Sequence, residues 1–172
     1  FGVGSSSMMS RAMGRGDRET VRRSSSFGFW CALLCGALLS VGFTAFSGPA
    51  LAVLGATEEN AAATFAYLFW TTTCGAVPAI LNVVLAYMVR SEGAALHAGI
   101  GTMSGCFLNI MLDPVFILPW GLNMGAAGAG LATFLSNCVA CCYFLVLLAV
   151  RRHSSNISLR PALPGRAIVV GV

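Results

Sequence analysis

A short polar stripe inside an apolar run carries the residues with the clearest chemical potential. Asp113 is the one formally charged side chain deep in the run 95–120, and Asn109 lies four residues before it. Residues four apart share one face of a helix, so an amide and a carboxylate would lie one turn apart. Such a pair can bind a hard cation such as Na⁺ through oxygen, or it can share a proton. We therefore predict a cation or proton site at Asp113 and Asn109, and no other metal site.

A proline and two glycines bear on where Asp113 points. Pro114 lacks an N–H group and its ring clashes with the carbonyl of Ile110, which predicts a kink beside the site. Gly101 and Gly105 lie on the same stripe and would let a neighbouring helix approach closely. An Asp at the centre of a bilayer costs about 2.5–3.5 kcal/mol, which favours a protein-facing position. The alternative is that Asp113 and Pro114 only mark a helix end at the membrane surface, with a solvated carboxylate.

Polar residues at helical spacing also mark two other apolar runs. They are Tyr67, Thr71, Pro78 and Asn82 in the run 63–89, and Thr133 and Asn137 in the run 126–150. Each set lies on one helix face, and Pro78 predicts a second kink. One interpretation is that these faces line a cavity. The other is that their side chains only form hydrogen bonds between helices.

The composition indicates the solvent in which these runs fold. Of the 172 residues, 57% are apolar and 9% are charged, with a mean hydropathy of +0.82. Soluble domains are about one quarter charged, so this chain is neither a disordered segment, a nucleic-acid-binding module nor an ordinary soluble enzyme. The natural partner of such a surface is a lipid bilayer.

Four apolar runs are long enough to cross that bilayer. A helix needs about 20 residues to cross about 30 Å of hydrocarbon, and backbone groups in lipid must be paired within the segment. We expect an all-α, polytopic transmembrane helix bundle with spans at 27–54, 63–89, 95–120 and 126–150. Residues 1–26 are interpreted as the end of a preceding helix with an Arg-rich loop, and 151–172 as a loop that leads into a further helix. The chain is accordingly expected to be a fragment of a longer membrane protein.

The charged loops predict an orientation. All ten basic residues are Arg, and five of them precede residue 27. Arg90 lies in the connection after the second span, Arg151 and Arg152 follow the fourth, and the two other connections carry no base. Basic and non-basic loops therefore alternate. By the positive-inside rule, the Arg-rich loops are cytoplasmic and the chain is a multi-pass protein of the cytoplasmic membrane.

Several of these motifs together resemble the multidrug and toxic compound extrusion (MATE) family. The most specific is Asn109-Ile-Met-Leu-Asp113-Pro-Val-Phe-Ile, followed by the small-residue stretch 124–133. The stretch Ser10-Arg-Ala-Met-Gly-Arg-Gly-Asp17 and the pattern Tyr67…Pro78…Arg90-Ser-Glu-Gly93 also fit. The resemblance implies twelve transmembrane helices in two six-helix lobes, and cation-coupled antiport of organic, often cationic, compounds. This chain would then form most of the N-terminal lobe.

The resemblance also implies roles for individual residues. The family's N-lobe cation site would use Asn109 and Asp113 from the fifth helix and Thr133 from the sixth. A fourth-helix tyrosine that lines the same cavity would be Tyr67. An acidic residue on a first helix, and a C-terminal lobe, would have to come from outside these residues. Apart from the coupling ion, H⁺ or Na⁺, no cofactor is implied.

The expected mechanism is alternating access, with Asp113 protonated or cation-bound in one state and empty in the other. One rival is a flippase for lipid-linked saccharides, which predicts a basic cavity. Another is a membrane scaffold or receptor that transports nothing. An enzyme is disfavoured, because the sequence contains neither an HExxH motif nor a set of Ser, His and Asp placed for hydrolysis.

Overall fold

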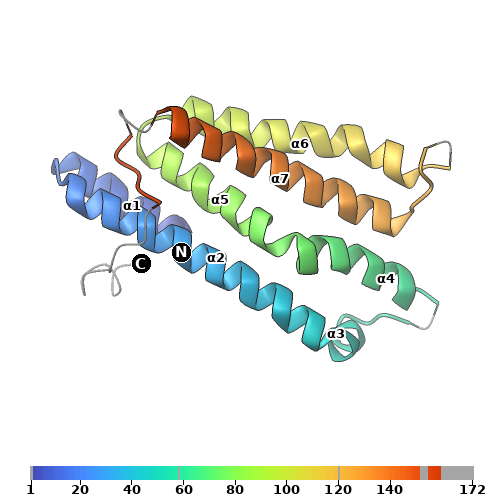
Figure 1. Ribbon diagram of the computed structural model, residues 1–172. Helices are drawn as coiled ribbons and strands as arrows, with labels where there is room; N and C mark the ends of the chain where they lie inside the picture. The colour runs from blue at the N-terminus through green and yellow to red at the C-terminus, as the bar shows by residue number, and fades with distance from the viewer. Residues whose placement is uncertain (1, 58, 120, 152–154, 160–172) are drawn as a thin grey trace.

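The computed structural model describes residues 2–57, 59–119, 121–151 and 155–159, and Figure 1 shows their arrangement. These residues form helices joined by short connections and contain no strand. The all-α fold class predicted from the apolar runs is therefore confirmed.

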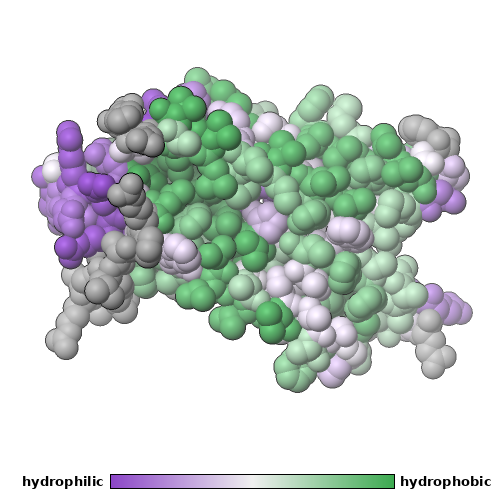
Figure 2. Space-filling model, in the orientation of Figure 1, coloured by the Kyte–Doolittle hydropathy of each residue, from purple (hydrophilic) through white to green (hydrophobic). Residues whose placement is uncertain are grey.

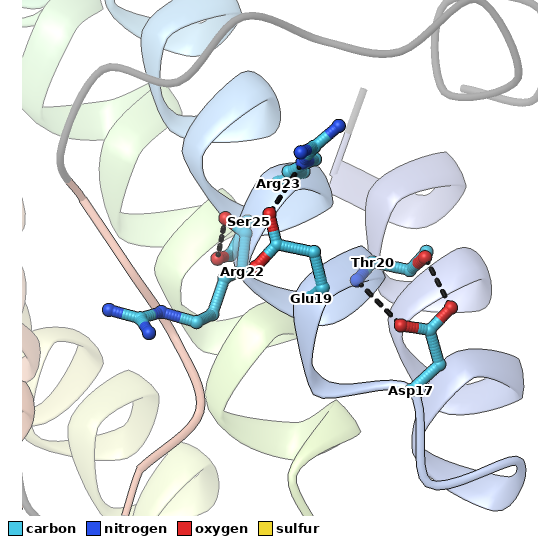
Figure 3. Close-up of polar contacts among 6 residues, drawn as sticks. All are labelled: Asp17, Glu19, Thr20, Arg22, Arg23 and Ser25. Carbon is cyan, nitrogen blue, oxygen red and sulfur yellow. Dashed lines mark hydrogen bonds and ion pairs between the residues drawn. The ribbon is translucent and has the colours of Figure 1, made fainter.

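The first two helices form an antiparallel hairpin. Helix α1 (Gly2–Gly14) is followed by a short turn, and α2 (Arg18–Ala45) begins directly after Asp17. The Asp17 carboxylate caps α2, because Oδ1 accepts from the Thr20 N–H at 3.0 Å and Oδ2 from the Thr20 hydroxyl at 2.5 Å (Figure 3). Most of the stretch expected to be an Arg-rich loop before Phe27 is thus helical. The missed signal is the capping residue Asp17, with a glycine of positive φ before it.

The predicted span 27–54 is divided into two helices. Helix α2 contains 28 residues, about 42 Å at 1.5 Å per residue, which exceeds the thickness of the hydrocarbon. It ends at Ala45, and after Phe46 the short helix α3 (Ser47–Val53) continues the chain. The first span therefore starts earlier and ends earlier than the apolar run suggests.

The predicted span 63–89 is bent. It comprises α4 (Ala61–Leu68), the π-helical segment η1 (Phe69–Cys74) and α5 (Ala76–Ser91), with an angle of 52° at the break. The break lies at Gly75, where an added Cβ would lie 2.6 Å from the carbonyl oxygens of Trp70 and Thr71. The kink expected from Pro78 is present, but its centre lies before the proline, which occupies the first turn of α5.

The last two helices lie side by side. Helix α6 (Ala95–Ile117) continues through Pro114 and ends one turn later at Leu118, and α7 spans Ala126–Val150. Thus α6 ends before residue 120, whereas α7 coincides with the predicted span. The connection folds back on α6, since the N–H groups of Leu122 and Met124 donate to the carbonyls of Val115 and Phe116, each at 2.9 Å.

The surface fits a bilayer. In the described part of the chain α2, α6 and α7 are each long and apolar enough to cross a membrane, and the bent α4–η1–α5 segment is a fourth span if counted as one. Large apolar side chains remain exposed along these helices, including Leu34, Leu38, Met103, Phe107 and Val146. Figure 2 shows this apolar surface over the middle of the molecule, with hydrophilic residues gathered at the end that holds the α1–α2 turn. We call this end the Arg-rich end; Arg11, Arg15, Arg18, Arg22 and Arg23 lie on it.

Candidate functional site

The close contact between α6 and α7 orients the polar stripe. Gly101 and Gly105 are buried, and a Cβ added at Gly105 would lie 3.1 Å from the Ala140 Cβ and 3.3 Å from the Ser136 carbonyl oxygen. The stripe therefore faces α7, as the two glycines predicted. Asn109, one turn beyond Gly105, must share this orientation.

Asn109 bridges the two helices. Its Nδ2 lies 3.5 Å from Oδ1 of Asp113 on α6 and 3.5 Å from Oγ1 of Thr133 on α7. The Thr133 hydroxyl also donates to the carbonyl of Ala129 at 3.0 Å. The three side chains are partly buried. The structure thus brings together Asp113, Asn109 and Thr133, the three residues predicted to bind the coupling ion.

A second polar pair extends this cluster to α5. Nδ2 of Asn82 donates to Oδ1 of Asn137 at 3.0 Å, and Nδ2 of Asn137 donates to the carbonyl of Thr133 at 3.0 Å. The other amide atom, Oδ1 of Asn82, is buried and accepts no hydrogen bond from the described residues. Side-chain amides therefore link the α5–α6–α7 junction, and Oδ1 of Asn82 has no donor among the described residues.

These residues line a hollow of about 170 Å³. Its described lining is uncharged: Asn82, Thr102, Gly105, Cys106, Asn109, Thr133, Ser136 and Asn137. Thr102, Cys106 and Ser136 were not among the predicted site residues. Thr102 could have been found, because it lies seven residues before Asn109 and so on the same helix face.

A neighbouring hollow of similar volume, about 170 Å³, lies toward the end of α5. It shares Asn82 and Thr102 with the first and adds Tyr87 and Arg90. The Arg90 guanidinium carbon lies 5.8 Å from the centre of the Tyr87 ring, over its face. Of the side chains that line the two hollows in the described structure, Arg90 is the one with a permanent positive charge.

Two predicted cavity residues lie elsewhere. The Thr71 hydroxyl donates to the carbonyl of Tyr67 at 3.0 Å, within the α4–η1 segment. The Tyr67 backbone lies against α7, where a Cβ added at Gly130 would be 2.8 Å from the Tyr67 carbonyl oxygen. The Tyr67 side chain is 39% exposed, and neither residue lines the two hollows. In this structure the Tyr67 backbone helps to pack α4 on α7, and the Thr71 hydroxyl is used within its own helical segment.

The cluster has the chemistry of a site for a hard cation or a proton. Carboxylate, amide and hydroxyl groups meet at Asn109, and Pro114 leaves the Ile110 carbonyl without a helical N–H partner. The described residues contain no group of three or more His, Cys, Asp or Glu side chains able to hold a metal ion. A cation here would therefore be bound by a single carboxylate and neutral oxygen atoms, a donor set suited to Na⁺ rather than to zinc or copper.

The arrangement of the helices is similar to that of solved transporters. A structure described as the inward-facing conformation of a multidrug resistance MATE family transporter matches with a TM-score of 0.89 and 27% identity, over 99% of this chain and 38% of that chain. A structure described as the outward-facing conformation of such a transporter matches with a TM-score of 0.87 and 30% identity, over 98% and 37%. The chain thus resembles both conformations about equally.

Curated relatives point the same way. Multidrug export protein MepA of Staphylococcus aureus (strain MSSA476) is 30% identical over 169 residues, which make up 98% of this chain and 37% of the relative. The chain therefore spans a little over one third of the length of this relative. The family model MatE matches residues 1–115, most of the chain, and those residues include the Asn109–Asp113 pair. The chain belongs to the MatE family, the MATE family that its sequence motifs resemble.

Proposed function

We propose that this chain forms part of a cation-coupled antiporter that exports organic, cationic drug-like compounds across the cytoplasmic membrane. The observation that carries the proposal is the contact of Asn109 with both Asp113 and Thr133 across the α6–α7 interface. A single half-buried carboxylate among neutral oxygen donors can exchange a proton or a monovalent cation without a large structural penalty.

In this mechanism Asp113 is the coupling group. It is loaded with H⁺ or Na⁺ in one state and empty in the other, and Asn109 and Thr133 act as neutral ligands. A ligand shifts a conformational equilibrium only through its different affinities for the two states. The coupling ion therefore drives export by binding the two states unequally. The helices would adjust at the bend near Gly75 and at Pro114, the proline inside α6.

The bound ion affects how Asn109 must be oriented. With Nδ2 directed at Asp113 and Thr133, the amide donates hydrogen bonds and so complements an acceptor oxygen on each residue. To ligate Na⁺, the amide must turn so that its Oδ1 faces the ion. Binding of Na⁺ therefore calls for the opposite amide orientation from the one in this structure.

The cavity for the organic substrate is assigned to the two hollows beside this cluster. Asn82 and Asn137 offer amide groups to a polar substituent, and the uncharged lining of the first hollow admits an organic cation without repulsion, whereas Arg90 lines the second hollow. The sequence resemblance adds that the remaining wall comes from a first helix and a C-terminal lobe. The Arg-rich end is assigned to the cytoplasmic side.

The first prediction tests the role of Asp113. The full-length product of the gene is expressed in an efflux-deficient bacterial host, and export of a fluorescent cationic dye is followed in everted membrane vesicles under an imposed H⁺ or Na⁺ gradient. Asp113→Asn keeps the size of the side chain but removes the charge, so we expect gradient-driven export to fall about tenfold or more. Glu59→Gln removes an acid from an exposed connection and should export like the unmodified protein. Unchanged export by Asp113→Asn at normal membrane abundance would reject the proposal.

A second candidate is the lipid-linked saccharide flippase, because Arg90 lines the hollow beside Asn82 and could hold a phosphate. It predicts movement of a lipid-linked saccharide, and no movement of the dye, in the same vesicles. A scaffold or receptor predicts that neither compound moves. The three functions therefore give three different outcomes in one assay.

A further inference from the structure

The segment after α7 returns to the bundle. Residues 155–159 run from Glu92, beside the end of α5, across to α2 at the Arg-rich end, as Figure 1 shows. We call these residues the strap. Two of its side chains, Ile157 and Leu159, pack against the buried core that α1, α2, α5 and α7 share. The strap is therefore docked through side chains as well as through its backbone.

One end of the strap is held by Glu92, which follows α5. The Ser155 hydroxyl donates to Oε2 of Glu92 at 2.7 Å, and the Asn156 N–H donates to Oε1 at 2.6 Å. The Ile157 N–H in turn donates to Oγ of Ser155 at 3.1 Å. Hydrogen bonds to an ionised carboxylate are roughly twice as strong as neutral ones. Both carboxylate oxygens are thus used to hold one short segment.

The other end of the strap is held by α2. The Ser158 N–H donates to Oγ of Ser25 at 3.0 Å, and the Ser25 hydroxyl lies within 3.2 Å of the Ser158 carbonyl oxygen. Nε1 of Trp30 donates to the carbonyl of Leu159 at 3.2 Å. Ser25 is buried and comes from the first part of α2, the stretch expected to be a loop. The unexpected helical start of α2 therefore provides this docking position.

We propose that the strap is a clamp that ties α2, the α5–α6 turn and the end of α7 together, with Glu92 as its positioning residue. The clamp keeps the Arg-rich end of this bundle closed and sets the direction in which the chain leaves α7. Because few residues separate the Glu92 contact from the Ser25 contact, release of one end should loosen the other. The clamp does not depend on what the protein transports, or on transport at all.

The similarity to structures described as inward-facing and outward-facing supports a permanent clamp rather than a gate. The chain matches both with TM-scores of 0.89 and 0.87, so the relative positions of these helices are alike in both. A contact that holds α2, α5 and α7 together is what such a rigid unit requires. Opening this end would break the bonds of the strap and expose Ile157 and Leu159.

Hydrogen exchange measured by mass spectrometry tests the clamp in the full chain, reconstituted in nanodiscs. Wild-type peptides covering 155–159 should exchange slowly, since the four successive N–H groups of residues 155–158 have partners. Glu92→Ala removes both acceptors, and we expect the whole strap to exchange about tenfold faster or more. Glu19→Ala is the matched control, because Glu19 is an acid at the same end that pairs with Arg23 and does not contact the strap.

Ser25→Ala decides whether the strap acts as one unit. If it does, this variant speeds exchange at Asn156 as well as at Ser158, although its own contacts are at Ser158. Exchange in α6 serves as the folding check, and Glu92→Gln, which retains one acceptor oxygen, should give an intermediate rate if Glu92→Ala fails to fold. The proposal is overturned if wild-type residues 155–159 exchange as fast as an unstructured peptide, or if Glu92 and Ser25 variants each affect only their own end.

Discussion

The Arg-rich end and the α5–α6–α7 junction both contain carboxylates, but they surround them differently. At the Arg-rich end, Glu92 accepts two hydrogen bonds of 2.6 and 2.7 Å, and Asp17 accepts two of 3.0 and 2.5 Å. At the junction, Asp113 is approached by one amide nitrogen at 3.5 Å, the long limit of a hydrogen bond. The first two carboxylates are held by the chain that they stabilise, whereas the third keeps most of its capacity to accept.

This difference separates a structural acid from an exchangeable one. A carboxylate whose oxygens are saturated by backbone N–H and hydroxyl groups is fixed, because any new ligand must displace charge-assisted bonds. A carboxylate with unused lone pairs in a partly buried position gains more from an arriving cation or proton. Substitutions that weaken either region, followed by measurement of the free energy of unfolding, test this difference.

The largest effect is expected where the junction is assembled. Gly105→Leu forces a side chain into the space between α6 and α7, where even a Cβ would already lie 3.1 Å from the Ala140 Cβ. We expect a loss of about 3 kcal/mol in the free energy of unfolding, measured by denaturant titration in detergent. Gly99→Leu lies on the same helix, where an added Cβ meets nothing within 4 Å, and should change stability by less than about 0.5 kcal/mol. Equal losses would mean that the close contact does not position the site.

A smaller loss is expected within the amide pair. Asn137→Ala removes the acceptor of the Asn82 Nδ2 group, whose other amide atom already lacks a partner among the described residues. We expect a loss of about 1–2 kcal/mol in the free energy of unfolding, because a partly buried donor is left unpaired. The double variant Asn82→Leu/Asn137→Leu should recover most of it, since neither polar group then remains. In a double-mutant cycle completed by the single variants Asn82→Leu and Asn137→Leu, additive losses would show that the two amides do not interact in the folded protein.

The two regions also differ in how far the sequence could predict them. The junction was predictable because its signals are local. Gly105, Asn109 and Asp113 are spaced four residues apart on one helix, and Thr133 and Asn137 have the same spacing on the next. The family resemblance then implied that Thr133 meets Asn109 and Asp113, but it implied no partner for Asn137. The placement of Tyr67 relative to Asn82 could not be predicted in this way, because the π-helical segment η1 lies between them and shifts the register of the residues that follow it.

The strap left no such signal. Glu92, Ser25 and Ser158 are far apart in the sequence, and nothing in their spacing indicates that they meet. Their contacts depend on the residues at which two helices begin and end, Arg18 for α2 and Val150 for α7. The helical start itself was predictable from Asp17, a favourable capping residue, but the run of arginines suggested a loop. Charge patterning was therefore a poor guide to the residue at which α2 begins.

The smallest effect is expected at Asp17, and it depends on pH. The hydrogen bonds from the Thr20 hydroxyl and the Thr20 N–H, together with the nearby Arg15, lower the pKa of Asp17 below its ordinary value of 3.8. A carboxyl group with a lowered pKa in the folded protein stabilises it above the unfolded-state pKa, and this contribution is lost as the pH falls through the folded-state pKa. Wild-type stability should therefore decrease below about pH 4 for this reason.

Asp17→Asn keeps a capping oxygen but cannot titrate. The melting temperature of this variant should therefore lie below that of the wild type at pH 7, and the difference should be smaller at pH 3. Glu59→Gln removes one negative charge from an exposed connection, and its difference in melting temperature from the wild type should change less between pH 7 and pH 3. If Asp17→Asn and wild type differ by the same amount at both pH values, the cap does not depend on the ionised carboxylate, and Asp17 would no longer belong with Glu92 as a saturated structural acid.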